Sequence, residues 1–279
     1  MRGNRLIASP ATAFAEAASQ ILSGKIWGGK VPEERIRVIA EGTPHQSPNV
    51  VLYWMHINRR WSWNYAVDRA LEWVADREKD LTVLETLPFH QTLTDRHAVF
   101  VMEGMREHES LVERGPFLYR AQSRKFGRIA VEYLYSLFQT CDVIIVDDHP
   151  DREYRAFLES LASRTRARIE AVDSSGLIPF RSVSRYYPTA RGFRTLVQKL
   201  LPDTLCQLPD PRPLPERIPF RTKKPSHPFW NAWREDHEVL LNPRQGVKEL
   251  PLDHSAGPVA TKGGPTAARN RWRQFLETA

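Results

Sequence analysis

The chain has 279 residues, of which 41% are hydrophobic, so it can bury a substantial core and is not a disordered protein. Its formal net charge of +7 favours polyanionic partners. No apolar run approaches the roughly 20 residues that span a bilayer, so we expect a soluble protein without membrane contact. The two cysteines, Cys141 and Cys206, lie far apart without metal-ligand spacing, which argues against a disulfide framework or a zinc site and favours a reducing, cytoplasmic compartment.

Residues 1–45 are predicted to form an amino-terminal extension. Arg2 and Arg5 precede an alanine-rich segment, but Pro10, Glu16 and Ser19 interrupt the apolar run that a signal peptide needs. We therefore expect a frayed extension with a short helix.

The first predicted strand is Val50–Met55, six apolar residues that follow the turn-forming residues 47–49. Such an unbroken run is typical of a strand buried on both faces of a parallel sheet. From Trp61 the apolar residues recur at helical spacing up to Val74. We expect a central strand followed by an amphipathic helix, the first half of a βαβ unit.

The same alternation of strand and helix recurs along the next hundred residues. Further strands are predicted at residues 81–85, 117–119, 142–147 and 169–173, and further helices at residues 94–115, 129–138 and 151–163. Short connections between alternating strands and helices are typical of a doubly wound sheet. The sequence therefore predicts an α/β fold with a five-stranded parallel sheet, in a Rossmann-like domain at residues 46–201.

The regular pattern ends after the fifth strand. One more amphipathic helix is predicted over residues 189–201, and the proline-rich segment 202–262 is predicted to be an irregular linker. Gly263, Gly264 and Pro265 then indicate the start of a last helix, at residues 263–279. Its apolar stripe consists of Trp272, Phe275, Leu276 and Ala279.

Several blocks of sequence resemble the DNA photolyase and cryptochrome family, in the family's order. The blocks are Leu52–Met55 with Arg59-Arg60 and Trp63–Ala66, Asp95–His97 with Met102–Met105, Val146–Pro150, Ala171–Pro179, Tyr187–Arg194 and Leu250–Arg269. The resemblance is to a deoxyribodipyrimidine photolyase of the class II-like bacterial form and extends from about Glu33 onward. It implies a photolyase-like α/β domain at residues 46–201 and the start of the family's helical domain at residues 263–279.

The resemblance also implies a function and its cofactors. In this family, light-dependent repair of pyrimidine dimers in DNA uses FAD, and the FAD site lies in the helical domain. The resemblance therefore implies that this chain is the antenna-type half, with dimer-containing DNA and a separate helical FAD-binding half as partners. We expect the isolated chain to bind no flavin and to repair no dimers. A fragment, a truncated reading frame and one piece of a split protein are all compatible with the sequence.

Open parallel sheets bind ligands beyond the carboxyl ends of their strands. The candidate residues at this edge are Met55, His56, Asn58, Asp147, Asp148, His149, Ser174 and Gly176. The resemblance implies an antenna chromophore there, a folate or a deazaflavin. An alternative for residues 147–149 is a helix amino-terminal cap with a nearby carboxylate pair. No catalytic residue and no metal ligand is predicted in this chain.

Two stretches without acidic residues, 114–128 and 181–199, combine cations with aromatic residues. In the second, Arg185, Arg191 and Arg194 accompany Tyr186 and Phe193. Such a combination suits phosphate neutralisation and base stacking, so the three arginines are candidate DNA contacts, although a solvated helix face is the alternative. We expect four tryptophans to be core residues and not members of an electron-transfer chain: Trp54, Trp61, Trp63 and Trp73.

The chain lacks the motifs of dinucleotide-binding proteins, P-loop enzymes, zincins and serine hydrolases. Two other functions stay open. One is a cryptochrome-like module that senses light or binds partners without repair. The other is a stand-alone nucleotide-binding α/β protein with Asp147 and residues 174–176 near a phosphate. The apolar stripe of the last helix disfavours a self-sufficient module and predicts that the isolated chain associates.

Overall fold

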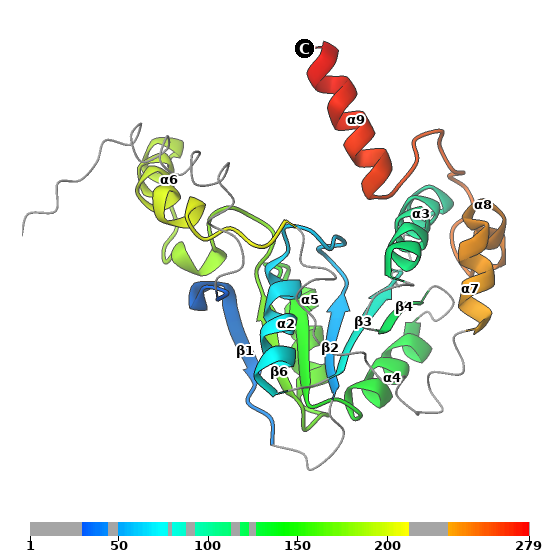
Figure 1. Cartoon of the computed structure of the whole chain (residues 1–279), viewed down its shortest axis with the longest axis horizontal. Helices are drawn as coiled ribbons and strands as arrows, with labels where there is room; N and C mark the ends of the chain where they lie inside the picture. The colour runs from blue at the N-terminus through cyan, green and yellow to red at the C-terminus, as the bar shows by residue number, and fades with distance from the viewer. Residues whose placement is uncertain are drawn as a thin grey trace, which may run out of the picture.

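The computed structural model describes residues 30–43, 50–77, 80–87, 93–112, 118–122, 127–211 and 234–278, which form a six-stranded sheet with helices on both faces (Figure 1). The strands are β1 (Ile36–Ala40), β2 (Val50–Met55), β3 (Asp80–Thr86), β4 (Leu118–Gln122), β5 (Val143–Asp147) and β6 (Arg168–Val172). Their order across the sheet is β1-β6-β5-β2-β3-β4. The helices around the sheet are α2 (Tyr65–Arg77), α3 (Asp95–Val112), α4 (Gly127–Phe138) and α5 (Arg152–Ala162).

The five strands expected from the sequence are present and parallel, and β2 is the middle one of the five. Every residue of β2 is buried, as its unbroken apolar run predicts. The prediction of a doubly wound parallel α/β sheet is therefore confirmed.

A sixth strand, β1, lies at one edge of the sheet and pairs antiparallel with β6. This strand was not predicted, because its residues fall within the segment 1–45, for which an extension was expected. Its side chains are half-buried or exposed, and its register shifts between Val38 and Ala40. It therefore shows neither an unbroken apolar run nor a clean alternation of apolar and polar residues.

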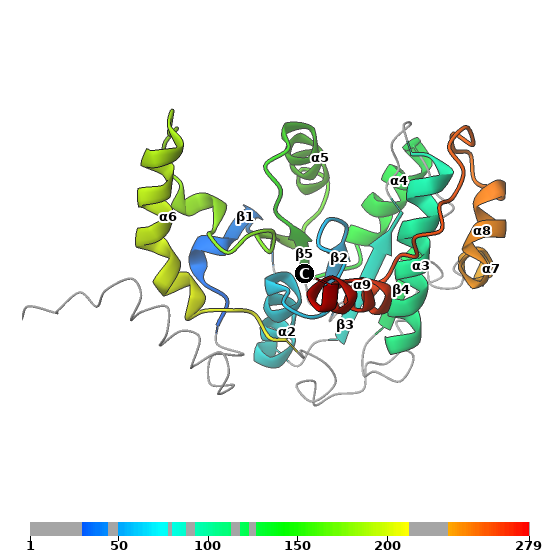
Figure 2. The same ribbon diagram turned by 90° about the horizontal axis from the view of Figure 1, so that it is seen from above.

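The sheet separates two apolar cores. On one face, Val51, Tyr53 and Met55 of β2 pack with residues of α2 and α3. On the other face, Leu52 and Trp54 pack with residues of α4 and α5. Figure 2 shows α4 and α5 on one side of the sheet and α2 on the other.

The segment predicted as a linker is helical over part of its length. It contains α7 (Arg234–Leu241), α8 (Pro243–Gly246) and the 3-10 turn η4 (Val247–Glu249). Val239, Leu240, Val247 and Leu250 are buried in the core on the α2 and α3 face. These elements are too short to show a sustained helical period, so only their packing against α3 reveals them.

Two helices extend away from the sheet: α6 (Ala190–Leu205), at the β1 end, and α9 (Pro265–Thr278), which ends the described chain (Figure 1). Two carboxylates of α3 hold the start of α9. Glu103 accepts a hydrogen bond from the Gly263 backbone N–H at 2.7 Å, and Glu107 accepts one from the Thr266 N–H at 2.9 Å. Among the described residues, no helix has the length and apolar character needed to cross a membrane.

Candidate functional site

Asp147, the last residue of β5, organises the loop that follows β2. Its carboxylate is buried and accepts hydrogen bonds from the backbone N–H groups of His56, Ile57 and Asn58 at 3.0, 2.7 and 3.0 Å. The Tyr53 hydroxyl donates a further bond to it at 3.0 Å. Burial, together with the nearby Asp147 carboxylate, raises the pKa of Tyr53 well above its ordinary value. One charged acceptor therefore fixes a whole turn against the neighbouring strand.

A second set of hydrogen bonds joins the loop after β2 to the loop after β6. The Ser174 hydroxyl donates to the side-chain oxygen of Asn64 at 2.9 Å, across 110 positions of sequence, and accepts from the backbone N–H of Ala66 at 3.1 Å. Arg60 donates to the Ser174 carbonyl, and the Asn64 amide donates to the Tyr53 hydroxyl at 3.0 Å. The carboxyl ends of β2, β5 and β6 thus share one hydrogen-bonded network.

The structure brings most of the predicted binding residues together, but it uses them internally. The side chains of Met55, Asn58, Asp147, Asp148 and Ser174 are buried. Gly176 was also predicted, and its carbonyl accepts a hydrogen bond from Arg35, the residue before β1. The polar side-chain atoms of Asn58, Asp147, Asp148 and Ser174 are engaged in hydrogen bonds or ion pairs within the chain and hold the loops at this edge in place.

Asp151, and not Asp148, is the helix cap that follows β5. Asp148 is buried and pairs with Arg37 at 2.9 Å and with Arg155 at 3.7 Å. The residue that caps α5 is Asp151, whose side chain accepts from the Tyr154 backbone N–H at 2.8 Å. The cap alternative for residues 147–149 is therefore wrong, because the helix begins four positions after Asp148, at Arg152.

Two predicted histidines lie beside α5. His56 is half-buried and stacks on Tyr154 with ring centroids 5.7 Å apart, and the edge of His149 faces the same tyrosine at 6.4 Å. Nδ1 of His149 accepts a hydrogen bond from the Asp151 backbone N–H at 3.3 Å. Within the residues that the structure describes, no three metal-ligating side chains gather into a site.

A buried polar cluster that was not predicted from the sequence surrounds Glu85 of β3. Its carboxylate lies 2.8 Å from Nδ1 of His108, accepts from the Tyr119 hydroxyl at 2.6 Å and pairs with Arg59 at 3.0 Å. Burial raises the pKa of Glu85, but His108 and Arg59 outweigh it, so the pKa lies below its ordinary value. Burial and the adjacent Glu85 carboxylate raise the pKa of Tyr119. The cluster joins α3 and β4 to the carboxyl end of β3.

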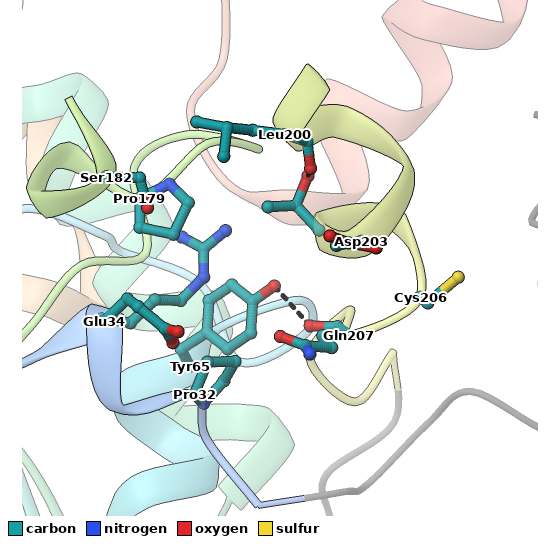
Figure 3. Close-up of a pocket in the computed structure, with 11 residues that line it drawn as sticks. Pro32, Glu34, Tyr65, Pro179, Ser182, Leu200, Asp203, Cys206 and Gln207 are labelled. Atoms are coloured by element: carbon teal, nitrogen blue, oxygen red, sulfur yellow. Dashed lines mark hydrogen bonds between the residues drawn. The ribbon is translucent and has the colours of Figure 1, made fainter. Parts of the chain in front are cut away.

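A cavity of about 330 Å³ lies between α6 and the start of α2 (Figure 3). The buried guanidinium of Arg35 lies 4.0 Å above the Tyr65 ring and donates to the carbonyls of Asp173, Gly176 and Leu177. Burial lowers the pKa of Arg35. The other residues that line the cavity are Pro32, Glu34, Pro179, Ser182, Leu200, Asp203, Thr204, Cys206 and Gln207. Because carbonyls engage the guanidinium and two lining residues are acidic, the cavity does not suit a phosphate.

A second hollow, of about 580 Å³, lies over β1 and β6, and Glu170 is among its lining residues. The Glu170 carboxylate accepts from Arg69 at 2.7 Å, from Arg168 at 2.7 Å and from the Trp73 indole at 3.0 Å. Burial raises the pKa of Glu170, but these hydrogen bonds lower it by more, so it lies below its ordinary value. The carboxylate in this hollow is therefore already paired with two arginines, Arg69 and Arg168.

The four tryptophans expected in the core divide into three groups. Trp54 and Trp61 are buried, Trp73 is half-buried, and Trp63 is 41% exposed, so the prediction was wrong for Trp63. Its φ of 57° is in the left-handed region that bulky residues rarely adopt. The spacing suggested the first turn of a helix, but α2 begins only at Tyr65, and Trp63 lies in the preceding turn.

The candidate DNA contacts Arg185, Arg191 and Arg194 are exposed, in and just before α6. Tyr186 is 85% exposed, and the Arg185 guanidinium lies 5.0 Å above the ring of Tyr187. The side chains of the other acid-free stretch, 114–128, lie largely outside the described residues. The segment 181–199 is therefore the cationic surface that the structure defines.

Comparison with protein-family models finds no match, and no curated protein matches this chain. Among solved structures, the chain is similar to a bacterial class III photolyase from Agrobacterium tumefaciens, with a TM-score of 0.47 and 14% sequence identity. The similarity covers 84% of this chain and 45% of that chain, so the chain spans less than half the length of that photolyase.

Proposed function

We propose that this chain is the α/β part of a light-dependent DNA-repair protein of the photolyase type. The observation that carries the proposal is that three of the sequence blocks that resemble this family converge on one edge of the sheet. The carboxylate of Asp147 holds residues 56–58, and the loop after β6 bonds to the loop after β2 through Ser174 and Asn64.

This convergence supports the family resemblance because it makes the blocks interdependent. Asp147 and His56 are 91 positions apart in sequence, yet a change of either the carboxylate or the loop would leave buried polar groups without partners. Short matches that arise by chance have no reason to fall on residues that bond to one another. The blocks therefore act as one structural unit.

The proposed function does not assign a cofactor site to the described residues. A photolyase uses FAD to supply the electron for dimer cleavage, and we assign no described residue of this chain to FAD. We also do not assign an antenna pigment to the eight residues predicted at the carboxyl edge, because Asn58, Asp147 and Ser174 among them are buried and engaged in hydrogen bonds within the chain. Asn58, Asp147 and Ser174 instead hold together the loops that follow β2, β5 and β6.

The stand-alone nucleotide-binding alternative is less well supported. Asp147 and Ser174, the residues on which it relied, are buried and engaged in hydrogen bonds with neighbouring loops. A phosphate site requires N–H groups or cations that are free to approach the ligand, whereas the N–H groups of residues 56–58 already point at a carboxylate.

Deletion of the gene in its source organism tests the proposal. We expect the deletion to lower survival after ultraviolet irradiation only when visible light follows, because photolyases use light to reverse dimers. Survival in the dark is the control, and expression of the gene from a plasmid should restore the light-dependent part. Equal survival of both strains in the light would contradict repair. A change in light-regulated transcription without a change in survival would favour the cryptochrome-like alternative.

A further inference from the structure

We propose that the segment Arg181–Lys199 is a binding surface for single-stranded nucleic acid, in which arginines neutralise phosphates and Tyr186 stacks on a base. This inference deepens the proposed function, because it rests on DNA as the partner and names the surface and the form of DNA. Three properties of the segment support it: its charge, its exposed aromatic rings and the burial of its aliphatic residues.

The charge of the segment is of one sign. No acidic residue occurs between Asp173 and Asp203, whereas the same interval contains Arg181, Arg185, Arg191, Arg194 and Lys199. The four that follow Arg181 are exposed, and within the described chain none of them pairs with a carboxylate. Unpaired cations on a projecting helix attract polyanions and release counterions when they bind phosphates.

The aromatic residues of the segment are available for stacking. Tyr186 is 85% exposed and Phe193 is 43% exposed. Tyr187 is half-buried and is held from two sides, by the Arg185 guanidinium at 5.0 Å and by the edge of the Phe193 ring at 5.9 Å. Tyr187 therefore supports its neighbours, while Tyr186 presents a free ring among cations. This arrangement fits unpaired bases, because bases within a duplex are already stacked on one another.

The apolar residues of α6 argue for nucleic acid over an anionic membrane. A helix that lies on a membrane turns an apolar face outward into the lipid. In α6, Leu196, Val197, Leu200 and Leu201 are half-buried, and Leu205 is buried. Figure 3 shows Leu200 at the cavity between α6 and the rest of the domain. Among the large apolar side chains of α6, only Phe193 is exposed, which is too small an apolar face for lipid. The exposed side of the segment therefore consists mainly of the arginines and Tyr186, which suits a phosphate backbone with accessible bases.

Fluorescence anisotropy of the full chain with a labelled oligothymidylate tests the inference, with salt varied from roughly 50 to 200 mM. The double variant Arg191→Gln/Arg194→Gln should reduce the slope of log affinity against log salt by about 1.4, since each phosphate contact on a single strand contributes about 0.7. Tyr186→Ala should weaken binding by about 5- to 150-fold, the range that corresponds to the loss of one stacked base.

The matched control is Arg96→Gln/Lys248→Gln, which removes the same charge from exposed sites on α3 and η4. It should leave the salt slope and the Tyr186 effect unchanged. A duplex of the same length and vesicles that contain phosphatidylserine serve as competing ligands. Equal affinity for duplex and single strand, binding to vesicles alone, or variants that bind like the wild type would each overturn the inference. If the gene still supports light-dependent survival in that case, the proposed repair function stands and only this surface assignment fails.

Discussion

The role of Asp147 is visible only at the level of its individual hydrogen bonds. It accepts from three consecutive backbone N–H groups in a buried position. Asp147→Asn keeps one oxygen that can accept from the three N–H groups, but it removes the charge that strengthens those bonds and turns an NH2 group toward the Asn58 side-chain amide, another donor. We therefore expect the free energy of unfolding to fall by about 3 kcal/mol. Urea unfolding followed by circular dichroism measures this loss. Asp76→Asn, an exposed site on α2, is the control and should change it by less than about 0.5 kcal/mol.

Glu170 should make the stability of the chain depend on acid pH. Its pKa in the folded chain is below its ordinary value, so its contribution is present above the unfolded pKa of about 4.3 and is lost as pH falls through the folded pKa. We expect Glu170→Gln to cost about 3 kcal/mol at pH 7, because it leaves Arg69 and Arg168 without their shared partner.

That cost should shrink as the pH falls below about 4. Urea unfolding of both proteins between pH 3 and pH 7 measures the difference. Glu41→Gln is the control, since Glu41 pairs with the same Arg168 but its side chain is 78% exposed, so its effect should stay within about 1 kcal/mol. A Glu170→Gln effect that is constant over this pH range would show that the carboxylate charge is not the cause.

The residues of the candidate site could be predicted in position but not in role. Asp147 and Ser174 lie at the carboxyl edge because strand ends are readable from apolar runs that stop at polar residues. Their partners are not readable, since the bonds from Asp147 to the loop after β2 span about 90 positions. His108 lies near the carboxyl end of α3, where nothing in the neighbouring sequence indicates that it faces Glu85.

At the level of elements, burial on both faces decides which strands could be predicted. β2 and β5 are buried at every residue, and each gives an unbroken apolar run. β1 is an edge strand with mixed exposure, and α7 and α8 are short. None of the three therefore has a periodic pattern of apolar residues that is long enough to be recognised in the sequence. Pairing with β6 and packing against α3 stabilise them instead.

The junction between α3 and α9 depends on two glycines. A Cβ on Gly263 would lie 1.9 Å from the Phe100 carbonyl oxygen, and Gly264 has a φ of +99°. Gly263→Ala should therefore separate α9 from α3. A 14-residue helix without tertiary contacts is only marginally stable in water. We expect faster amide hydrogen exchange across α9 while the amides of β2 stay protected.

Hydrogen exchange followed by mass spectrometry resolves the two regions. The matched control is Gly257→Ala, because a Cβ there meets no atom within 4 Å. Unchanged exchange in α9 for Gly263→Ala would mean that the junction tolerates the extra carbon and does not hold the helix. Faster exchange throughout the sheet would mean that the clash disturbs α3 itself.

The whole molecule combines a compact α/β body with two projecting helices of different chemistry. At the β1 end, α6 presents cations, and α9 presents large apolar side chains. The exposed fractions of Trp272, Phe275 and Leu276 are 59%, 58% and 57%, and the rings of the first two stack with centroids 5.8 Å apart. An apolar stripe of this kind, exposed to water, favours association.

We therefore expect the isolated chain to self-associate through α9. Burying Trp, Phe and Leu side chains contributes roughly 1.5 to 3 kcal/mol each, and the stripes of two chains together can offset the entropic cost of a weak association. Trp272→Ser/Phe275→Ser should shift sedimentation toward the monomer and raise solubility. Arg271→Ser/Arg273→Ser, at two other exposed positions of the same helix, controls for the lower helix propensity of serine and should sediment like the wild type. The prediction fails if the wild type and the Trp272→Ser/Phe275→Ser variant both sediment as monomers at every concentration, because the exposed stripe would then have no effect on association.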